Sequence, residues 1–164
     1  VNGYGIYAGS RNRWITPAAD NFGFAKWVVD NAFDLINLGP GRHYGEWWGA
    51  GIQRRYGLTE KRFSLFNVAQ FCLHGTTPAI ISSSTPKARL KYQEVLTACC
   101  LLVPVLWSGI FHTADINTAV ENLRLNGSKA APGFMNPEGV VIYHEAARQV
   151  FKVLLDNDQG SKGE

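Results

Sequence analysis

The stretch PEGVVIYH, residues 137–144, places one acidic side chain, Glu138, directly before a run of β-branched and aromatic residues. Such residues favour a strand, and the proline and glycine on either side of Glu138 mark where the strand begins. A second apolar run, VFKVLL at residues 150–155, follows the polar segment HEAARQ. The two runs predict an antiparallel hairpin that turns near Glu145.

The expected register of this hairpin brings two opposite charges together. If the numbers of cross-strand partners sum to about 290, Lys152 lies opposite Glu138, and both side chains leave the sheet on one side because strand side chains alternate. Taken alone, such a pair is an ordinary solvated surface contact worth a few tenths of a kcal/mol. Whether it has a function depends on what else the chain places beside it.

Composition limits the classes of protein that need to be considered. The 164 residues, 46 % of them hydrophobic, suffice for one buried core and not for two, so we expect a single domain over residues 1–164. The net charge of +3 permits a polyanionic partner without requiring one. The three cysteines, two of them adjacent at 99 and 100, form neither a disulfide framework nor a zinc-ligand spacing.

No part of the sequence has the character of a membrane span or a secretion signal. The longest apolar run, LLVPVLW at residues 101–107, is far shorter than the roughly 20 residues that a membrane span needs. No signal region is visible at the N-terminus. We therefore expect a cytoplasmic protein without a membrane partner.

The N-terminal segment is informative because of what it lacks. Asn2-Gly3 is the strongest two-residue hairpin signal, yet only Val1 precedes it. The strand that would pair with YGIYAGSR, residues 4–11, is therefore missing, and we expect an N-terminally truncated domain. Arg11 and Arg13 follow in a loop, where an ordinary exposed arginine and a ligand-binding arginine are about equally expected.

A helix is expected next. Pro17 and Asp20 lead into a pattern that predicts one helix from about residue 21 or 22 to Leu38, ended by Gly39. Its expected apolar face consists of Val28, Val29, Ala32, Phe33 and Ile36.

Two more stretches alternate with the period of a strand, HYGEWWG at residues 43–49 and RFSLFNV at residues 62–68. Glu46 shares a face with Tyr44 and Trp48, and a carboxylate in aromatic company needs a partner. Either an arginine of the basic loop QRRY, residues 53–56, meets it in a structural pair, or it accepts hydrogen bonds from a ligand hydroxyl. Phe66 is expected either in the core or, at the strand end, stacked on a flat base.

The remaining elements are simpler. A helix is expected over about residues 88–97, and LLVPVLWSGIF, residues 101–111, predicts a strand that Pro104 confines to an edge or a bulge. Asp115 or Asn117 caps a short helix that runs through Leu125 and is ended by Gly127. The basic loop at residues 53–56 suits phosphate, although a solvated surface loop would have the same composition.

Four motifs now stand in a fixed order: AGSR at residues 8–11, HYGEWWG, RFSLFNV, and PEGVVIYH with a lysine-bearing strand after it. This order, over nearly the whole chain, resembles the nucleotidyltransferase domain of the RNA ligase family, one of the covalent nucleotidyltransferases that also include DNA ligases and capping enzymes. The resemblance implies an α+β fold in which antiparallel sheets flanked by helices, an ATP-grasp-like ligase domain, hold a nucleotide between them.

The resemblance also implies roles for residues that match the family by position. The nucleotide-binding residues would be Arg11 of the second motif, Glu46 on the ribose, Phe66 on the base, Glu138 on the phosphate or metal side, and Lys152 of the last motif. Glu138 and Lys152 would be the catalytic residues, with Glu138 as the ligand of Mg²⁺.

Three loop arginines complete the expected binding surface. Arg13, Arg54 and Arg55 are candidates for contacts with RNA phosphates, because they lie in loops next to the matched motifs.

This sequence departs from the family pattern at three places. It contains no Lys-x-Asp-Gly motif, which carries the family's nucleophilic lysine upstream of the AGSR element. The last motif usually has two lysines one residue apart, whereas Val150 and Leu154 flank Lys152 here, so either lysine of the motif could correspond to Lys152. Asn67 stands where an aspartate is common after the stacking aromatic. We therefore expect this chain by itself to form no covalent adenylate.

Two classes of function follow from the resemblance. In the first, the chain belongs to an ATP-dependent RNA ligase of RNA repair that uses ATP and Mg²⁺ and seals 5′-phosphate and 3′-hydroxyl RNA ends through lysyl-adenylate and adenylylated RNA intermediates. In the second, it is a degenerate domain that binds nucleotide or RNA without ligating. A DNA ligase or a capping-type nucleotidyltransferase is a further alternative, ranked below these two. A Lys-x-Asp-Gly sequence encoded upstream would favour the first.

Overall fold

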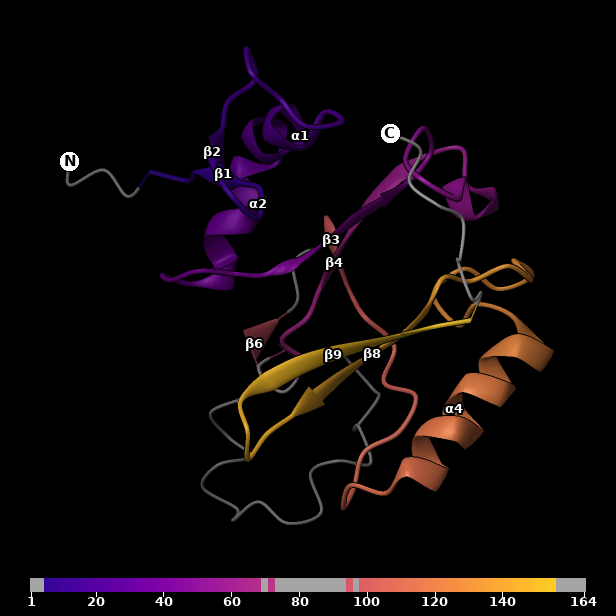
Figure 1. Cartoon of the computed structure of the whole chain (residues 1–164). Coiled ribbons are helices and arrows are strands. Elements are labelled where there is room, and N and C mark those ends of the chain that lie inside the picture. The colour runs from indigo at the N-terminus through magenta and orange to yellow at the C-terminus, as the bar shows by residue number, and fades with distance from the viewer. Residues whose placement is uncertain (1–4, 69–70, 73–93, 96–97, 156–164) are drawn as a thin grey trace, which may run out of the picture.

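The computed structural model describes residues 5–68, 71–72, 94–95 and 98–155, and Figure 1 traces the elements along the chain. The helices are α1 (Phe24–Asp30), α2 (Ala32–Leu35) and α4 (Thr113–Asn126), with short 3-10 turns at Ile36–Leu38 and Arg55–Gly57. The strands are β1 (Ala8–Gly9), β2 (Trp14–Ile15), β3 (Gly45–Gly49), β4 (Lys61–Leu65), β5 (Phe71–Cys72), β6 (Glu94–Val95), β7 (Cys100–Leu102), β8 (Gly139–His144) and β9 (Gln149–Leu154). This is the α+β class predicted from the sequence.

The strands form small sheets rather than one large one. β1 pairs with β2, β3 with β4, and β8 with β9, each antiparallel, while β7 joins the other edge of β4 in parallel and β5 pairs with β6 in parallel. Among the described residues β7 is an edge strand, as predicted for the segment with Pro104, but the strand predicted over residues 101–111 is wrong beyond Leu102, where β7 ends. The helix predicted over residues 88–97 is wrong at 94–95, which form β6; the rest of that range lies outside the described residues.

The core lies where α1 packs on one side of the β3–β4 pair. Four aromatic rings, those of Phe24, Trp27, Trp47 and Phe63, contact one another with centroids 5.0 to 5.8 Å apart. Leu65 next to them is fully buried. Trp47, Phe63 and Leu65 project from the same side of the pair because strand side chains alternate, and we call this side the core face.

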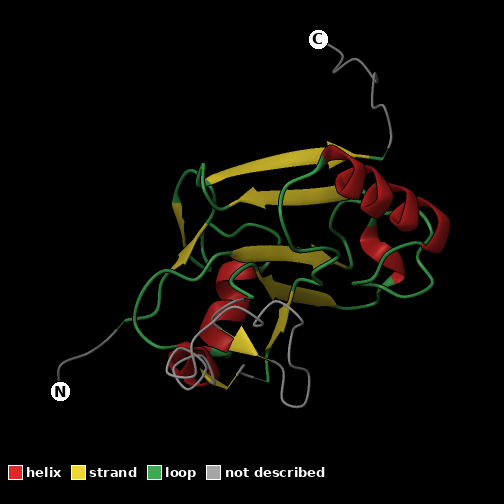
Figure 2. Cartoon of the chain, turned by 90° about the horizontal axis from the view of Figure 1, so that it is seen from below, coloured by secondary structure: helices red, strands yellow, loops and turns green. Residues whose placement is uncertain are grey.

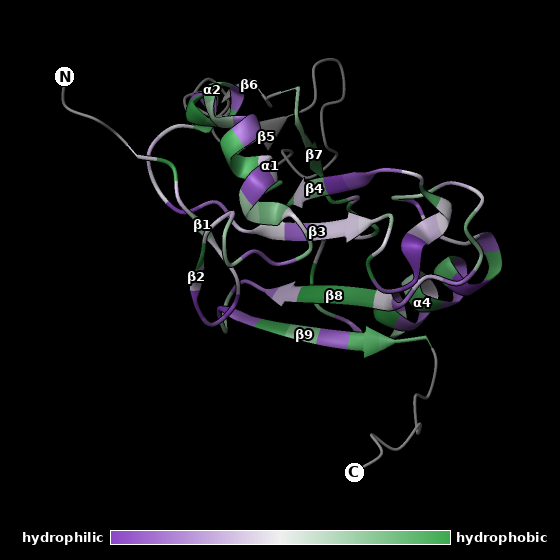
Figure 3. Cartoon of the chain, turned by 90° about the horizontal axis from the view of Figure 1, so that it is seen from above, coloured by the Kyte–Doolittle hydropathy of each residue, from purple (hydrophilic) through white to green (hydrophobic). Residues whose placement is uncertain are grey.

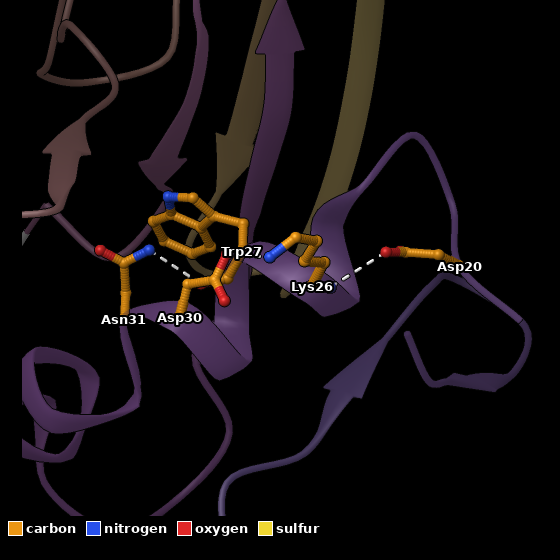
Figure 4. Close-up of polar contacts among 5 residues, drawn as sticks. All are labelled: Asp20, Lys26, Trp27, Asp30 and Asn31. Atoms are coloured by element: carbon orange, nitrogen blue, oxygen red, sulfur yellow. Dashed lines mark hydrogen bonds and ion pairs between the residues drawn. The ribbon is translucent and has the colours of Figure 1, made fainter. Parts of the chain in front are cut away.

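Helix α1 is fixed at both ends by side chains (Figure 4). At its start the carboxylate of Asp20 accepts hydrogen bonds from the backbone N–H groups of Ala25 and Lys26 at 2.7 and 2.9 Å. A slight loss of water, which would raise the pKa of Asp20, is outweighed by these bonds, so the pKa lies below its ordinary value. At the other end Asn31 Nδ2 donates to the carbonyl of Trp27 at 2.8 Å.

The single helix predicted up to Leu38 is wrong, because the chain breaks at Asn31. The backbone of Asn31 leaves the helical region, with φ −108° and ψ 16°, although the Trp27 carbonyl accepts bonds from both the N–H and the side chain of Asn31. The buried residues keep a helical spacing across Asn31, so the apolar face was expected on the wrong side of the helical segment. Val28 is buried as predicted, whereas Val29, Phe33 and Ile36 are exposed, and Ala25, Leu35 and Leu38 are buried in addition.

From Thr113 to Leu154 the chain forms α4 and the β8–β9 hairpin, which pack beside each other. α4 begins at Thr113, ahead of the predicted caps, and ends as predicted at Gly127, whose φ of 73° suits a residue without Cβ. Figures 2 and 3, from opposite sides, show the hairpin running alongside the β3–β4 pair. The hairpin is therefore confirmed, and it lies next to the sheet that carries Glu46.

The predicted register of the hairpin is wrong by three residues. Lys152 lies opposite Val141, and His144 opposite Gln149. The reason is the turn. Residues 145–148 form a four-residue loop in which the N–H of Arg148 donates to the Glu145 carbonyl at 3.2 Å, and the N–H of Ala147 donates to Nδ1 of His144 at 3.1 Å. The turn, not the apolar pattern, sets the register.

Candidate functional site

The other side of the β3–β4 pair carries the predicted site residues. Glu46 lies opposite Ser64, and the N–H of Phe66 donates to the Tyr44 carbonyl at 2.9 Å, so the ladder continues past the end of β4. Glu46 and Phe66 therefore project from the same side. We call this side, with Tyr44, Glu46, Ser64 and Phe66, the open face. Phe66 has 48 % of its surface exposed, so it is not the core residue that one of the two expectations made it.

The β8–β9 hairpin contributes an ion pair. Lys152 Nζ donates to Glu138 Oε1 at 2.6 Å, although the two residues are not cross-strand partners. Glu138 precedes β8, and Gly139 after it has φ 156°, a conformation in which a Cβ would collide with the carbonyl of Val153. This close approach of the two strands brings the ends of both side chains together. Both are about half exposed, so ligands can reach them.

The electrostatics of Glu46 connect the two sheets. The pKa of its carboxyl group is raised, first because neighbouring atoms displace water from it and second because of the negative charge of Glu138. Lys152 and Arg11 act in the opposite direction without cancelling the rise. The charges of Arg11, Glu138 and Lys152, from three other segments, therefore act on the carboxyl group of Glu46.

The structure assigns the three loop arginines to different surroundings. Arg13 is exposed in the turn between β1 and β2, and Arg55 is exposed as well. Arg54 donates to the backbone and side-chain oxygens of Asn136 at 3.2 and 3.0 Å, which ties its loop to the segment before β8. Within the described ranges Glu46 forms an ion pair with neither Arg54 nor Arg55, so the structural pair considered for it is not formed.

A comparison with known protein families matches residues 1–154 to the family described as RNA ligase. The chain belongs to the RNA ligase family. The resemblance seen in the four motifs is thereby confirmed, and the match runs through all the elements that carry the site. No curated protein and no solved structure matches the chain. In the described part of this RNA ligase family chain, none of the helices has the length and apolar character needed to cross a lipid bilayer.

The carboxylates of the site fit a metal ion that brings other ligands with it. Among the described residues no group of three or more histidine, cysteine and acidic side chains could hold a metal by itself. Mg²⁺, however, is usually held by one or two carboxylates together with water and substrate phosphates. Glu46 and Glu138, whose negative charges act on each other, are the two carboxylates that could contribute to such a site.

One contact between two buried residues on the side of the open face was not predicted by the sequence analysis. Trp48 Nε1 donates to Ser64 Oγ at 2.8 Å, and both residues are buried. Ser64 is the cross-strand partner of Glu46, so this bond fixes the indole of Trp48 beside that position. Alternation could have placed each residue on the same side, but their contact depends on the cross-strand register, which one sequence does not give.

Proposed function

We propose that this chain provides the nucleotide-binding site of an ATP-dependent RNA ligase that seals 5′-phosphate and 3′-hydroxyl RNA ends through lysyl-adenylate and adenylylated RNA. One observation supports the proposal above all. The charges of Arg11, Glu138 and Lys152 act on the carboxyl of Glu46, which shares the open face with the exposed ring of Phe66. An aromatic ring, a carboxylate and two cations are what a base, a ribose and phosphates need.

Each side chain has a distinct task in holding the nucleotide. The ring of Phe66 stacks on the adenine, since every base has a flat π-face. Glu46 has lost water and has no ion-pair partner among the described residues, so it accepts hydrogen bonds from the ribose hydroxyls and recovers part of its desolvation cost. Arg11 and Lys152 donate charge-assisted hydrogen bonds to phosphate oxygens.

Glu138 and Glu46 would hold Mg²⁺, which would neutralise phosphate charge. The chain itself contributes by positioning the Glu138 carboxylate. The short contact with Lys152 Nζ keeps the Glu138 carboxylate directed toward the place where the phosphates lie. Removal of either partner would leave the other charge without this contact.

Lys152 is a phosphate ligand in this scheme and not the nucleophile. Formation of the lysyl-adenylate requires an amine lone pair that attacks the α-phosphorus while pyrophosphate leaves. Lys152 Nζ is engaged as a hydrogen-bond donor to Glu138, so its protons and not a lone pair point at the site. A lysine of the Lys-x-Asp-Gly type is the family's nucleophile, and AMP then passes to the RNA 5′-phosphate before the 3′-hydroxyl attacks and AMP leaves.

Calorimetric titration with ATP and AMP in the presence of Mg²⁺ tests the proposal. We expect the wild-type chain to bind both, and Phe66→Ala to bind about 1 to 3 kcal/mol more weakly, the size of one base-aromatic stack. Phe33→Ala is the matched control, because Phe33 is an exposed phenylalanine on α2. A wild-type chain that binds neither nucleotide would contradict the proposal, and equal affinity of the Phe66→Ala variant would remove Phe66 from the site.

A second measurement separates the ligase from the alternative of a nucleotide-binding domain without ligase activity. Incubated with labelled ATP and Mg²⁺, the 164-residue chain should form no stable AMP adduct, whereas a chain extended upstream through a Lys-x-Asp-Gly strand should form one. An extended chain that binds ATP but forms no adduct would favour the alternative. Mass spectrometry that locates AMP on Lys152 above trace level would overturn the role assigned to Lys152.

A further inference from the structure

The outer side of the β1–β2 hairpin exposes two aromatic rings. Tyr7 has 78 % of its surface exposed and Trp14 has 68 %, and the two rings meet edge to face with centroids 6.3 Å apart. Trp14 lies opposite Gly9, close enough that a Cβ on Gly9 would come within 3.5 Å of the indole. We call Tyr7, Gly9 and Trp14 the aromatic face of the hairpin.

The aromatic face is held in place from behind. Ala8 and Ile15 alternate with these residues, pair with each other, and are buried in the core. The turn is closed by the N–H and the hydroxyl of Ser10, which donate to the Arg13 carbonyl at 2.8 and 3.2 Å. The rings are therefore presented on an anchored strand pair. Exposed apolar surface that is fixed in this way is characteristic of an interaction site.

All the charged side chains in the segment that carries the aromatic face are positive. Arg11 and Arg13 occupy the turn and are exposed, and residues 1–19 contain no acidic residue. Within the described residues neither guanidinium forms an ion pair or a hydrogen bond. The charge of Arg11 also reaches Glu46, so the hairpin adjoins the proposed nucleotide site. The complementary partner is a polyanion with flat apolar parts.

We propose that the aromatic face binds an unpaired nucleobase of the RNA strand being joined, with Trp14 stacked on the base, Tyr7 supporting the indole from its edge, and Arg13 on a neighbouring phosphate. The inference rests on the proposed function, and it adds the surface that holds RNA beyond the bound nucleotide. Single-stranded RNA fits best, because bases expose their π-faces to side chains only where they are unstacked. A basic turn beside aromatic rings is the combination that single-strand binding uses.

Fluorescence anisotropy with the full chain and a labelled, 5′-phosphorylated single-stranded RNA of about 12 nucleotides tests the inference. We expect Trp14→Leu to weaken RNA binding by roughly 5- to 100-fold, because leucine retains apolar surface but cannot stack. Trp14→Phe, which keeps a ring, should recover most of the affinity. Phe33→Leu is the matched control and should change nothing, because Phe33 is an exposed aromatic residue on α2, with 87 % of its surface exposed.

The arginine is tested through the salt dependence of the same binding. Removal of one phosphate contact lowers the slope of log K against log salt by roughly 0.7 for a single strand. We expect this for Arg13→Gln and not for Arg148→Gln, an exposed arginine in the β8–β9 turn. Wild-type RNA affinity in Trp14→Leu, or an equal loss in Phe33→Leu, would overturn the base contact, and an unchanged slope in Arg13→Gln would overturn the phosphate contact.

Nucleotide titrations distinguish the failure of this inference from the failure of the proposed function. If the wild-type chain binds ATP and Phe66→Ala does not, but Trp14→Leu binds RNA normally, only the aromatic face is wrongly assigned. If the wild-type chain binds neither ATP nor RNA, both are wrong. Trp14→Leu should leave ATP affinity unchanged, because Trp14 does not belong to the open face.

Discussion

The two faces of the β3–β4 pair are built from alternate residues of the same strands and yet differ in almost every physical property. On the core face Leu65 is completely buried, and Phe63 contacts the rings of α1. One position further along, Phe66 leaves half of its ring in water, and Glu46 across the pair keeps a carboxyl group without an ion partner among the described residues. The core face stabilises the fold, and the open face leaves interactions for a ligand to complete.

The largest effect that the comparison predicts is on the core face. Leu65→Ala should lower the free energy of unfolding by about 2 to 5 kcal/mol, the usual cost of a cavity at a fully buried leucine. Phe66→Ala at the neighbouring position should cost at most about 1.5 kcal/mol, because half of its surface is already in water. Urea unfolding of the two variants measures both. If both variants lost the same free energy of unfolding, the open face would contribute to stability as much as the core face does.

A smaller effect is expected where α1 is held against the core face. Asp20→Ala should cost about 1 kcal/mol in the free energy of unfolding, because two helix N–H groups lose their acceptor. Asp20→Asn, which keeps one acceptor oxygen, should cost less.

The pH dependence of that loss has a definite sign. Since the pKa of Asp20 is lowered by folding from 3.8, its contribution is present above pH 3.8 and disappears as the pH falls through the lower folded value. The difference between wild type and Asp20→Ala should therefore shrink in acid, and thermal unfolding at pH 7 and pH 3 checks this. A difference that grows in acid would contradict the capping role.

The smallest effect is on the open face and has the opposite sign. The pKa of Glu46 is raised by folding from 4.5, so the folded protein holds the proton more tightly and loses stability as the pH rises above 4.5. Glu46→Gln should therefore stabilise the protein at pH 7 by about a few tenths of a kcal/mol, since solvent screens an exposed group, and should leave it unchanged below pH 4.

Nucleotide binding is the second half of that experiment. Glu46→Gln should weaken ATP binding at pH 7 while it stabilises the fold, because an amide is a weaker acceptor for hydroxyl groups than a carboxylate. Thermal unfolding at the two pH values and ATP titration at pH 7 measure both consequences. A variant that is less stable at pH 7 would show that Glu46 belongs to the structure and not to a ligand site.

The sequence predicted the positions that depend on period-two alternation. The sides of Glu46 and Phe66, the hairpin that carries Lys152, and the end of α4 at Gly127 all follow from local pattern and turn chemistry, which act over a few residues. The order of the four motifs predicted the family, which the match over residues 1–154 confirmed.

The errors have two local causes. The apolar residues of the first helical segment fit two faces, and the buried face is that of Val28, Leu35 and Leu38 and not that of Val29, Phe33 and Ile36. The bond from the Ala147 N–H to His144 fixes a longer turn than the apolar pattern suggested, and so shifts the partner of Lys152. The contact of Lys152 with Glu138 formed nevertheless, because Gly139 lets the strands approach closely.

The parallel pairing of β7 with β4 has a consequence for the order in which the protein folds. β3 and β4 are joined by a short loop, but Phe63 finds Cys100 only after the chain between them, including residues 66–99, has returned to the same end of the sheet. Non-local pairings of this kind close late, since the entropy of a long loop is lost before any contact compensates it. We expect β7 to dock after the β3–β4 hairpin and α1 have formed.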